Sequence, residues 1–435
     1  MKQINRLFFI SSCVYFLFLS TSCSKRLFAP PPPPPDPSDT LEPVSQKLTA
    51  RIYIDATVSM EGFVAPGIST NYAQILQPLE TAVVSGWRDV QVEFYKFGTQ
   101  VSSLPGRTYL KAAQRDFYQD SDIKKKTLIE EVIDSDDTGG LTVIVSDLFE
   151  TDADVTLLMT KLKEKYLQKN LAVGVLGIKS QYDGTVYDAG INAYAFSYRS
   201  DENPDSFRPF YVLILGKHAD VAHYFEQLKA SVLSAFVPEA EFVIFSRHLV
   251  NPLSSFEEAS MDSIDKIVEV GNLIKPDNQD NRLKQFLIRG NPKTAAFIAT
   301  LKYTSLPYTM SFNPTELEPE VIAHLCQGNT LVESLEAKRS FVIEQINLSD
   351  AGITFQAKLT PTLLSGNGIY CYEVILRPKA SAYQMPDWFS AWNMDTTQEG
   401  FKTLNLNRLL SGLWRAIVQI HQPKIAKFYC YIKKG

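Results

Sequence analysis

The chain has 435 residues, with 43 Lys and Arg side chains against 48 Asp and Glu side chains and a formal net charge of −5. A chain of this length exceeds one typical hydrophobic core, so we expect two domains. A mildly acidic protein lacks the clustered positive charge that nucleic acids attract, so we expect no nucleic-acid partner.

The N-terminus has the pattern of an export signal. Two positive residues precede an apolar run from Leu7 to Leu19, which is shorter than the roughly 20 residues that a membrane-spanning helix requires. Three small residues then lead to Cys23. This arrangement resembles the bacterial lipobox, in which the signal is cut before a cysteine that receives the lipids. The resemblance implies a signal peptide over residues 1–22 and a lipid on Cys23.

Cleavage would remove Lys2 and Arg6 and change the formal charge by two units, to −7. Cys13 is a second candidate for lipidation, but its upstream apolar run is shorter. A signal anchor that is never cut is the alternative, and both alternatives place the rest of the chain outside the cytoplasm. Ser24 follows Cys23 in place of an Asp that would retain some lipoproteins in the inner membrane, which favours the outer membrane in a Gram-negative envelope.

Residues 23–47 are expected to form a spacer between the lipid and the folded protein. Pro30 to Pro35 is unbroken, and such a run adopts a stiff polyproline II helix and not a sheet or an α-helix. The simplest role for a stiff segment after a lipid anchor is to hold the folded protein away from the bilayer.

Residues 48–236 alternate between short apolar runs and amphipathic stretches, which predicts an α/β domain whose mostly parallel sheet is covered by helices on both faces. The predicted strands cover residues 50–55, 90–97, 141–145, 171–178 and 210–215, and the predicted helices begin near Thr70, Ser121, Ala153 and Asp220.

Residues 237–435 have a different character, and we expect an α+β or β-sandwich-like domain there. Residues 250–290 are polar and predicted to be partly helical. The predicted strands cover residues 294–303, 340–346, 353–359, 369–376 and 427–432, and a helix is predicted over residues 404–420. A turn signal at residues 349–352 predicts a hairpin.

Oxygen-bearing side chains follow the first predicted strand of the α/β domain. Asp55 ends this apolar strand, and Thr57 and Ser59 follow at two-residue spacing. Because ligands of open α/β sheets bind outside the carboxyl ends of the strands, these three side chains can face one crevice. One carboxylate and two hydroxyls form a hard-oxygen set that suits Mg²⁺ or Mn²⁺ and not zinc.

This segment resembles the metal-ion-dependent adhesion site of the von Willebrand factor A (VWA) family, which opens with Asp-x-Ser-x-Ser. Here the motif is Asp55-Ala-Thr57-Val-Ser59. The resemblance implies a Rossmann-like VWA domain and a second motif at Asp147, although Leu148 stands where the family has Gly. The family also supplies a Thr at the start of a helix; Ser121 is favoured for this position, and Thr127 is the alternative.

The resemblance implies a binding module without enzymatic activity. The divalent cation would bind a protein or peptide ligand that supplies a carboxylate. A metal-free scaffold of a cell-envelope assembly is the alternative hypothesis, and a metal-dependent hydrolase that uses the same carboxylates is a third.

Three cysteines remain after Cys23, and none has the CxxC spacing of a thiolate metal site or a redox motif. An oxidising compartment permits one disulfide, for which Cys371 and Cys430 are the candidate pair. Three buried free thiols are the alternative.

Overall fold

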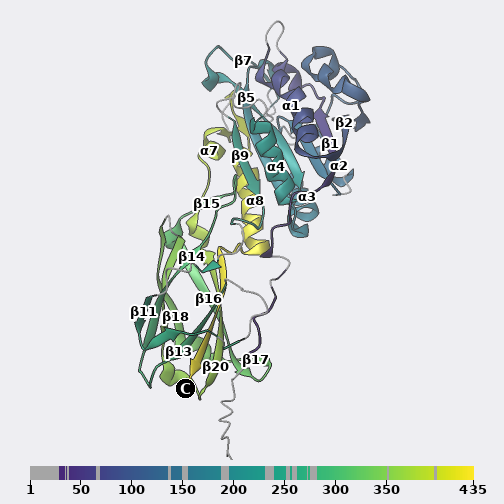
Figure 1. Cartoon of the computed structure of the whole chain (residues 1–435). Coiled ribbons are helices and arrows are strands. Elements are labelled where there is room, and N and C mark those ends of the chain that lie inside the picture. The colour runs from purple at the N-terminus through teal and green to yellow at the C-terminus, as the bar shows by residue number, and fades with distance from the viewer. Residues whose placement is uncertain are drawn as a thin grey trace, which may run out of the picture.

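The computed structural model describes residues 29–34, 36, 39–64, 69–135, 139–148, 155–187, 195–230, 240–250, 255–256, 262–271, 273–274, 282–349, 352–395 and 399–435. The protein is mixed α/β and consists of two units that lie end to end (Figure 1). An α/β unit built on a seven-stranded sheet forms one end, and a β-sandwich forms the other. Among the described residues, no helix is long and apolar enough to cross a membrane.

The seven-stranded sheet has the strand order β3-β2-β1-β4-β8-β5-β9. Its strands are β1 (Lys47–Asp55), β2 (Asp89–Phe97), β3 (Ser102–Ser103), β4 (Leu141–Ser146), β5 (Ala172–Ser180), β8 (Arg208–Gly216) and β9 (Glu241–Phe245). The expected parallel pairing is present where β1 lies between β2 and β4. The remaining pairs are antiparallel, so the sheet is mixed.

The antiparallel strand β8 separates β4 from β5, an arrangement that the sequence pattern did not predict. A parallel neighbour needs a long crossover, usually a helix. Between β5 and β8 the chain instead forms a small hairpin of β6 (Asp183–Val186) and β7 (Phe196–Arg199), and β8 then returns alongside β5 in the opposite direction. Because Ser146 at the end of β4 pairs with Tyr211, this return places the first residue of β8, Arg208, just beyond the carboxyl end of β4.

Helices cover both faces of this sheet. On one face, α1 (Asn71–Gly86) and α4 (His218–Leu228) share a buried core with β1, β4 and β8. Thr70 caps α1 as expected, because its side chain accepts a hydrogen bond from the Ala73 N–H. The other face packs against α2 (Ile129–Ser135), α3 (Val155–Lys165) and α8 (Leu406–His421).

The α/β unit therefore extends beyond the expected boundary at residue 236. Strand β9 belongs to the seven-stranded sheet. The C-terminal helix α8 follows strands of the sandwich in the chain and packs against this same sheet. Three tryptophans are buried in the same core: Trp388 at the start of α7 (Trp388–Ala391), Trp392 just after it, and Trp414 in α8.

The second unit is built from two sheets that share one buried core, and we refer to it as the β-sandwich. One sheet contains β10 (Ser255–Phe256), β11 (Asp262–Asp265), β14 (Ala295–Lys302), β18 (Phe341–Ser349) and β19 (Gly352–Leu359); the other contains β12 (Ile267–Glu269), β13 (Leu283–Ile288), β16 (Leu317–Gln327), β17 (Thr330–Glu333), β20 (Gly368–Pro378) and β24 (Ala426–Lys434). Shorter elements include α6 (Leu335–Ser340) and two strand pairs, β15 (Ser311–Phe312) with β21 (Tyr383–Gln384) and β22 (Asn393–Met394) with β23 (Thr403–Leu404).

The predicted hairpin at residues 349–352 is confirmed by the antiparallel pairing of β18 with β19, although residues 350 and 351 lie outside the described ones. The helical prediction for residues 250–290 is wrong for the described part of this segment, which forms strands. Each of these strands pairs with a longer strand of the sandwich or with its neighbour, and that tertiary pairing outweighs the weak local pattern.

The expected disulfide between Cys371 and Cys430 is not formed, and both residues are buried free thiols. Cys371 pairs with Tyr431 across β20 and β24, while Cys430 pairs with Tyr372. Because successive side chains of a strand point to opposite faces, the two thiols lie on opposite sides of the sheet. Cys371 belongs to the outer cluster and Cys430 to the inner core.

Candidate functional site

Two buried carboxylates lie side by side at one edge of the seven-stranded sheet. Asp55 is the last residue of β1, and Asp147 directly follows β4, its parallel neighbour. Asp55 is 0% exposed and Asp147 is 1% exposed. The sequence prediction that both carboxylates reach one edge of the sheet is therefore met by the geometry.

Three hydroxyls connect these carboxylates. The Thr57 hydroxyl donates to Asp55 Oδ1 over 2.6 Å, and its oxygen lies 3.2 Å from Ser59 Oγ. The Ser59 hydroxyl donates to Asp147 Oδ1 over 3.2 Å. Thr57 Oγ1 also lies 3.0 Å from Thr127 Oγ1. All three side chains are buried.

Thr127, and not Ser121, is the third hydroxyl of this cluster. Ser121 is exposed, and its hydroxyl lies 3.4 Å from Oδ1 of the neighbouring Asp122. The sequence prediction placed a helix start near Ser121, but residues 121–125 form turns and α2 begins at Ile129. Thr127 therefore precedes the helix, where its backbone can approach the cluster. The misplaced helix start explains the wrong choice.

The environment of Asp55 disfavours its ionised form. The Ser146 hydroxyl donates to Asp55 Oδ2 over 2.7 Å, so both carboxylate oxygens accept hydrogen bonds from hydroxyls. Burial, followed by repulsion from Asp147, nevertheless raises the pKa of Asp55 to about 7. A positive charge within a few ångströms would reverse this effect and favour the carboxylate.

A buried arginine, which the sequence prediction missed, neutralises part of this charge. Arg208 opens β8, and its Nη2 lies 3.8 Å from Asp147 Oδ2. The arginine side chain is 1% exposed. Its Nη1 donates to the carbonyls of Gly400 and Lys402, which precede α8. The sequence feature that could have indicated Arg208 is its position as the one charged residue at the start of an otherwise apolar strand.

Tyr182 supports the turn that carries Ser59. Its ring is buried and lies 5.5 Å from the Arg208 guanidinium. Its single hydroxyl proton is shared between the carbonyl oxygens of Thr185, at 2.7 Å, and Ser59, at 3.2 Å. The ring packs directly on Gly62, where an added Cβ would lie 2.3 Å from a ring carbon. Glycine is therefore required here by the close approach of Tyr182.

Leu148 follows Asp147 with a left-handed backbone conformation, at φ 56°. This region favours glycine, and a leucine there is strained. The Leu148 N–H donates to the Ser146 hydroxyl, and its side chain is 4% exposed in the hydrophobic core. The backbone thus has the shape that a glycine would adopt, and burial of the leucine side chain offsets the strain.

The donor set fits a hard divalent cation. Two carboxylates and the hydroxyls of Thr57, Ser59 and Thr127 supply only oxygen atoms, which Mg²⁺ and Mn²⁺ prefer. Among the described residues, no group of three or more His, Cys, Asp and Glu side chains is placed to hold a metal ion. Any cation here would consequently need hydroxyl ligands in addition to the two carboxylates.

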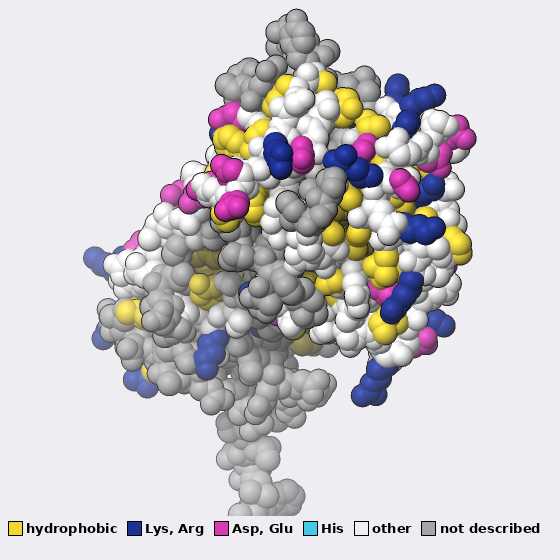
Figure 2. All heavy atoms as spheres, turned by 90° about the horizontal axis from the view of Figure 1, so that it is seen from above, with side chains coloured by type: hydrophobic (Ala, Val, Ile, Leu, Met, Phe, Trp, Pro, Cys, Tyr) yellow, Lys and Arg dark blue, Asp and Glu magenta, His cyan; other side chains and the backbone are white. Residues whose placement is uncertain are grey.

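The surface above the α/β unit carries charged side chains of both signs, interspersed with uncharged ones over its described part (Figure 2). No protein family matches the chain, and no match was found among curated proteins or solved structures.

Proposed function

We propose that the protein is a membrane-tethered, extracytoplasmic lipoprotein whose VWA-like α/β unit binds a protein partner through a divalent cation. The observation that carries this proposal is the meeting of Asp55, Thr57, Ser59, Thr127 and Asp147. These five side chains come from three separate segments, and hydrogen-bond distances of 2.6–3.2 Å link them.

Charge supports a carboxylate as the group that the partner supplies. With Arg208 present, the two ionised carboxylates leave one net negative charge in a buried site. A bound Mg²⁺ or Mn²⁺ would change this to one net positive charge. Since an uncompensated charge is costly away from water, an incoming carboxylate from a protein or peptide would complete the neutralisation.

One structural feature favours a second function, a metal-free scaffold of an envelope assembly. The Arg208 guanidinium already holds Asp147, and all the oxygen ligands are buried. In this alternative, a proton on Asp55 balances the remaining charge, because its pKa is about 7. The partner would then contact the outer surface of the unit.

Calorimetric titration of residues 24–435 with Mg²⁺ and with Mn²⁺ tests the proposal. We expect one site in the wild-type protein and none in the Asp55→Asn variant, which keeps the size of the side chain but removes its charge. Ser121→Ala is the matched control and should bind as the wild type does. A folded wild-type protein that binds neither cation would overturn the metal-dependent function and favour the scaffold.

A further inference from the structure

The segment that precedes β1 is bound along the length of the molecule and does not stand free as a spacer. We call its described residues 29–34, 36 and 39–46 the strap. The Ala29 N–H donates to the Leu273 carbonyl over 3.1 Å, and the Tyr431 hydroxyl donates to the Pro30 carbonyl over 2.8 Å. Ala29 is 6% exposed within an apolar cluster on the outer face of the sandwich.

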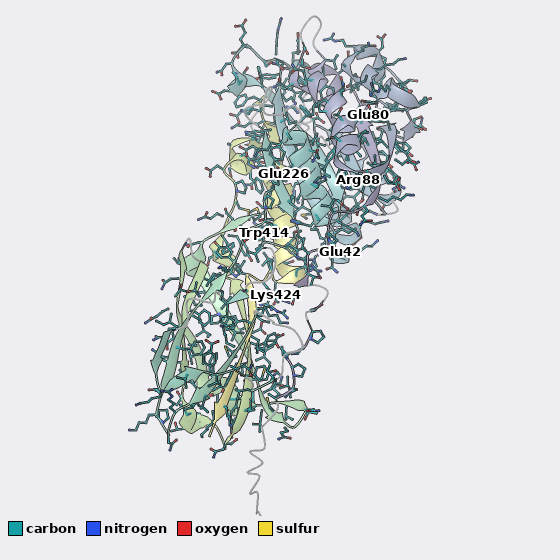
Figure 3. All side chains as sticks on the ribbon, in the orientation of Figure 1. Glu42, Glu80, Arg88, Glu226, Trp414 and Lys424 are labelled. Carbon is teal, nitrogen blue, oxygen red and sulfur yellow. The ribbon has the colours of Figure 1, made fainter. Side chains whose placement is uncertain are left out.

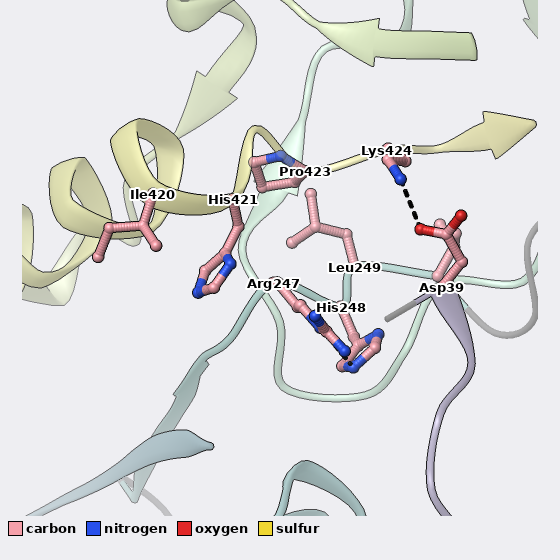
Figure 4. Close-up of a pocket in the computed structure, with 9 residues that line it drawn as sticks. Asp39, Arg247, His248, Leu249, Ile420, His421, Pro423 and Lys424 are labelled. Carbon is pink, nitrogen blue, oxygen red and sulfur yellow. Dashed lines mark hydrogen bonds and ion pairs between the residues drawn. The ribbon is translucent and has the colours of Figure 1, made fainter. Parts of the chain in front are cut away.

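The middle of the strap is held where the two units meet. Asp39 Oδ1 accepts a hydrogen bond from Lys424 Nζ over 2.6 Å, and Asp39 Oδ2 lies 3.6 Å from Lys427 Nζ. Asp39 lines a cavity of about 150 Å³ at this junction (Figure 4). Nearby, Glu42 pairs with Lys217, and Figure 3 shows Glu42 and Lys424 at the level of the junction.

The end of the strap is fixed to the α/β unit. The N–H and the hydroxyl of Ser45 donate to the two carboxylate oxygens of Asp220, each over 2.7 Å. Asp220 lies in the first turn of α4, and its side chain is buried. The strap therefore joins the sandwich, the junction and the α/β unit.

From these contacts we infer that the sandwich stands directly on the lipid bilayer and that the candidate site faces away from it. This inference rests on the lipid anchor at Cys23 of the proposed function. From Cys23 to Ala29 the chain can span at most about 21 Å. Ala29 is fixed beside Tyr431, close to the end of β24 at which the chain terminates. The base of the sandwich is thereby held within reach of the membrane surface.

The candidate site lies at the opposite end of the molecule. From Tyr431 back to Lys424 the extended chain covers about 23 Å at 3.3 Å per residue. Helix α8 has 16 residues and adds about 24 Å. The helix begins beside the segment that holds Arg208 and ends at the junction, where His421 contacts the Leu167 carbonyl. Since α8 and β24 follow one another along the long axis (Figure 1), the site lies about 45 Å beyond Ala29.

Energy transfer from the protein to a bilayer dye tests this orientation. A fluorescent donor is attached to Asn367→Cys, beside the start of β20, or to Ser197→Cys on β7 at the far end; both positions are exposed. Cys326→Ser removes the half-buried thiol, and Cys371 and Cys430 are buried. In vesicles with an acceptor lipid, we expect several-fold stronger quenching at position 367. Equal quenching, or stronger quenching at 197, would overturn the inference.

Two variants test whether the strap sets this height. Ala29→Glu places a charge in the apolar cluster and should weaken the quenching at position 367, whereas Val44→Glu changes an exposed strap residue and should not. Unchanged quenching in Ala29→Glu would contradict the role of the strap. Mass analysis of the N-terminal peptide reports lipidation separately. If Cys23 carries no lipid, residues 24–435 with an N-terminal histidine tag on nickel-chelating lipids give the same height measurement.

Discussion

The Arg208 guanidinium lies 3.8 Å from the Asp147 carboxylate, and each side chain is 1% exposed. The pair joins the carboxyl end of β4 to the start of the antiparallel strand β8. Because the same guanidinium donates to the Gly400 and Lys402 carbonyls, it also holds the segment before α8. The inserted strand thus brings to the candidate site a charge that opposes the two carboxylates.

Removal of this charge should have opposite effects on stability and on cation binding. Arg208→Met leaves Asp147 buried without its guanidinium, which we expect to lower the free energy of unfolding by about 3–5 kcal/mol. The site then has two net negative charges, so Mg²⁺ should raise the melting temperature of the variant more than that of the wild type. Thermal unfolding with and without Mg²⁺ measures both effects. A Mg²⁺ shift equal to or smaller than that of the wild type would contradict the charge argument.

The hydroxyl of Thr127 should contribute directly to cation binding. Thr127→Ala removes an oxygen that lies 3.0 Å from Thr57 Oγ1, and we expect at least a tenfold loss of Mg²⁺ affinity, equivalent to about 1.4 kcal/mol. Thr127→Ser keeps the oxygen and should bind nearly as the wild type does. Calorimetry compares the two variants. If both variants lost the same Mg²⁺ affinity, the packing of the Thr127 methyl group, and not its hydroxyl, would be responsible.

The sequence predicted the central part of the candidate site because local patterns define it. An apolar strand that ends at Asp55, and a second that ends before Asp147, suffice to place two carboxylates at one edge of a sheet. The strands β1, β2, β4 and β5 and the helices α1 and α8 were predicted near their observed positions for the same reason.

Features that depend on pairing between distant segments were beyond the sequence pattern. An apolar run such as residues 210–215 indicates a buried strand but not its direction, so the antiparallel placement of β8 was missed. Arg208 became part of the site only through that placement. The docking of the proline-rich segment likewise depends on Tyr431, which lies near the other end of the chain.

Acid should destabilise the folded protein through two buried histidines, His218 and His248. Burial lowers the pKa of His218 to about 3 and, together with Arg247 and His421, lowers that of His248 to about 4. An unfolded histidine titrates near 6.5, so the unfolded chain binds more protons than the folded protein between pH 6.5 and 4. The free energy of unfolding should therefore fall as the pH falls through this window.

Calorimetric melting at pH 7, 6, 5 and 4 measures this dependence. The neutral side chain of His218→Gln cannot be protonated, so its melting temperature should fall less steeply with acid than that of the wild type. The ring centroids of His218 and His248 lie 5.9 Å apart. The double variant, with His218→Gln and His248→Gln, should therefore show the weakest dependence of melting temperature on pH. Identical slopes in the wild type and the double variant would show that these histidines do not control the acid response.

The strained conformation of Leu148 predicts an unusual order of stability. Glycine normally destabilises a fold relative to alanine, because it loses more backbone entropy on folding. At φ 56° the order should reverse, since a left-handed conformation costs a residue with a Cβ about 1–2 kcal/mol. We therefore expect Leu148→Gly to be about 1 kcal/mol more stable than Leu148→Ala, although both lose the buried side chain and fall below the wild type by about 2–5 kcal/mol.

Urea unfolding of the three proteins measures the order directly. The comparison between Gly and Ala isolates the backbone, because neither variant retains the apolar side chain of Leu148. If alanine proved the more stable, the backbone at this position would not be strained, and the leucine would be explained by packing alone. The expected order would instead mean that the backbone after Asp147 is held in a conformation that is strained for any residue with a Cβ.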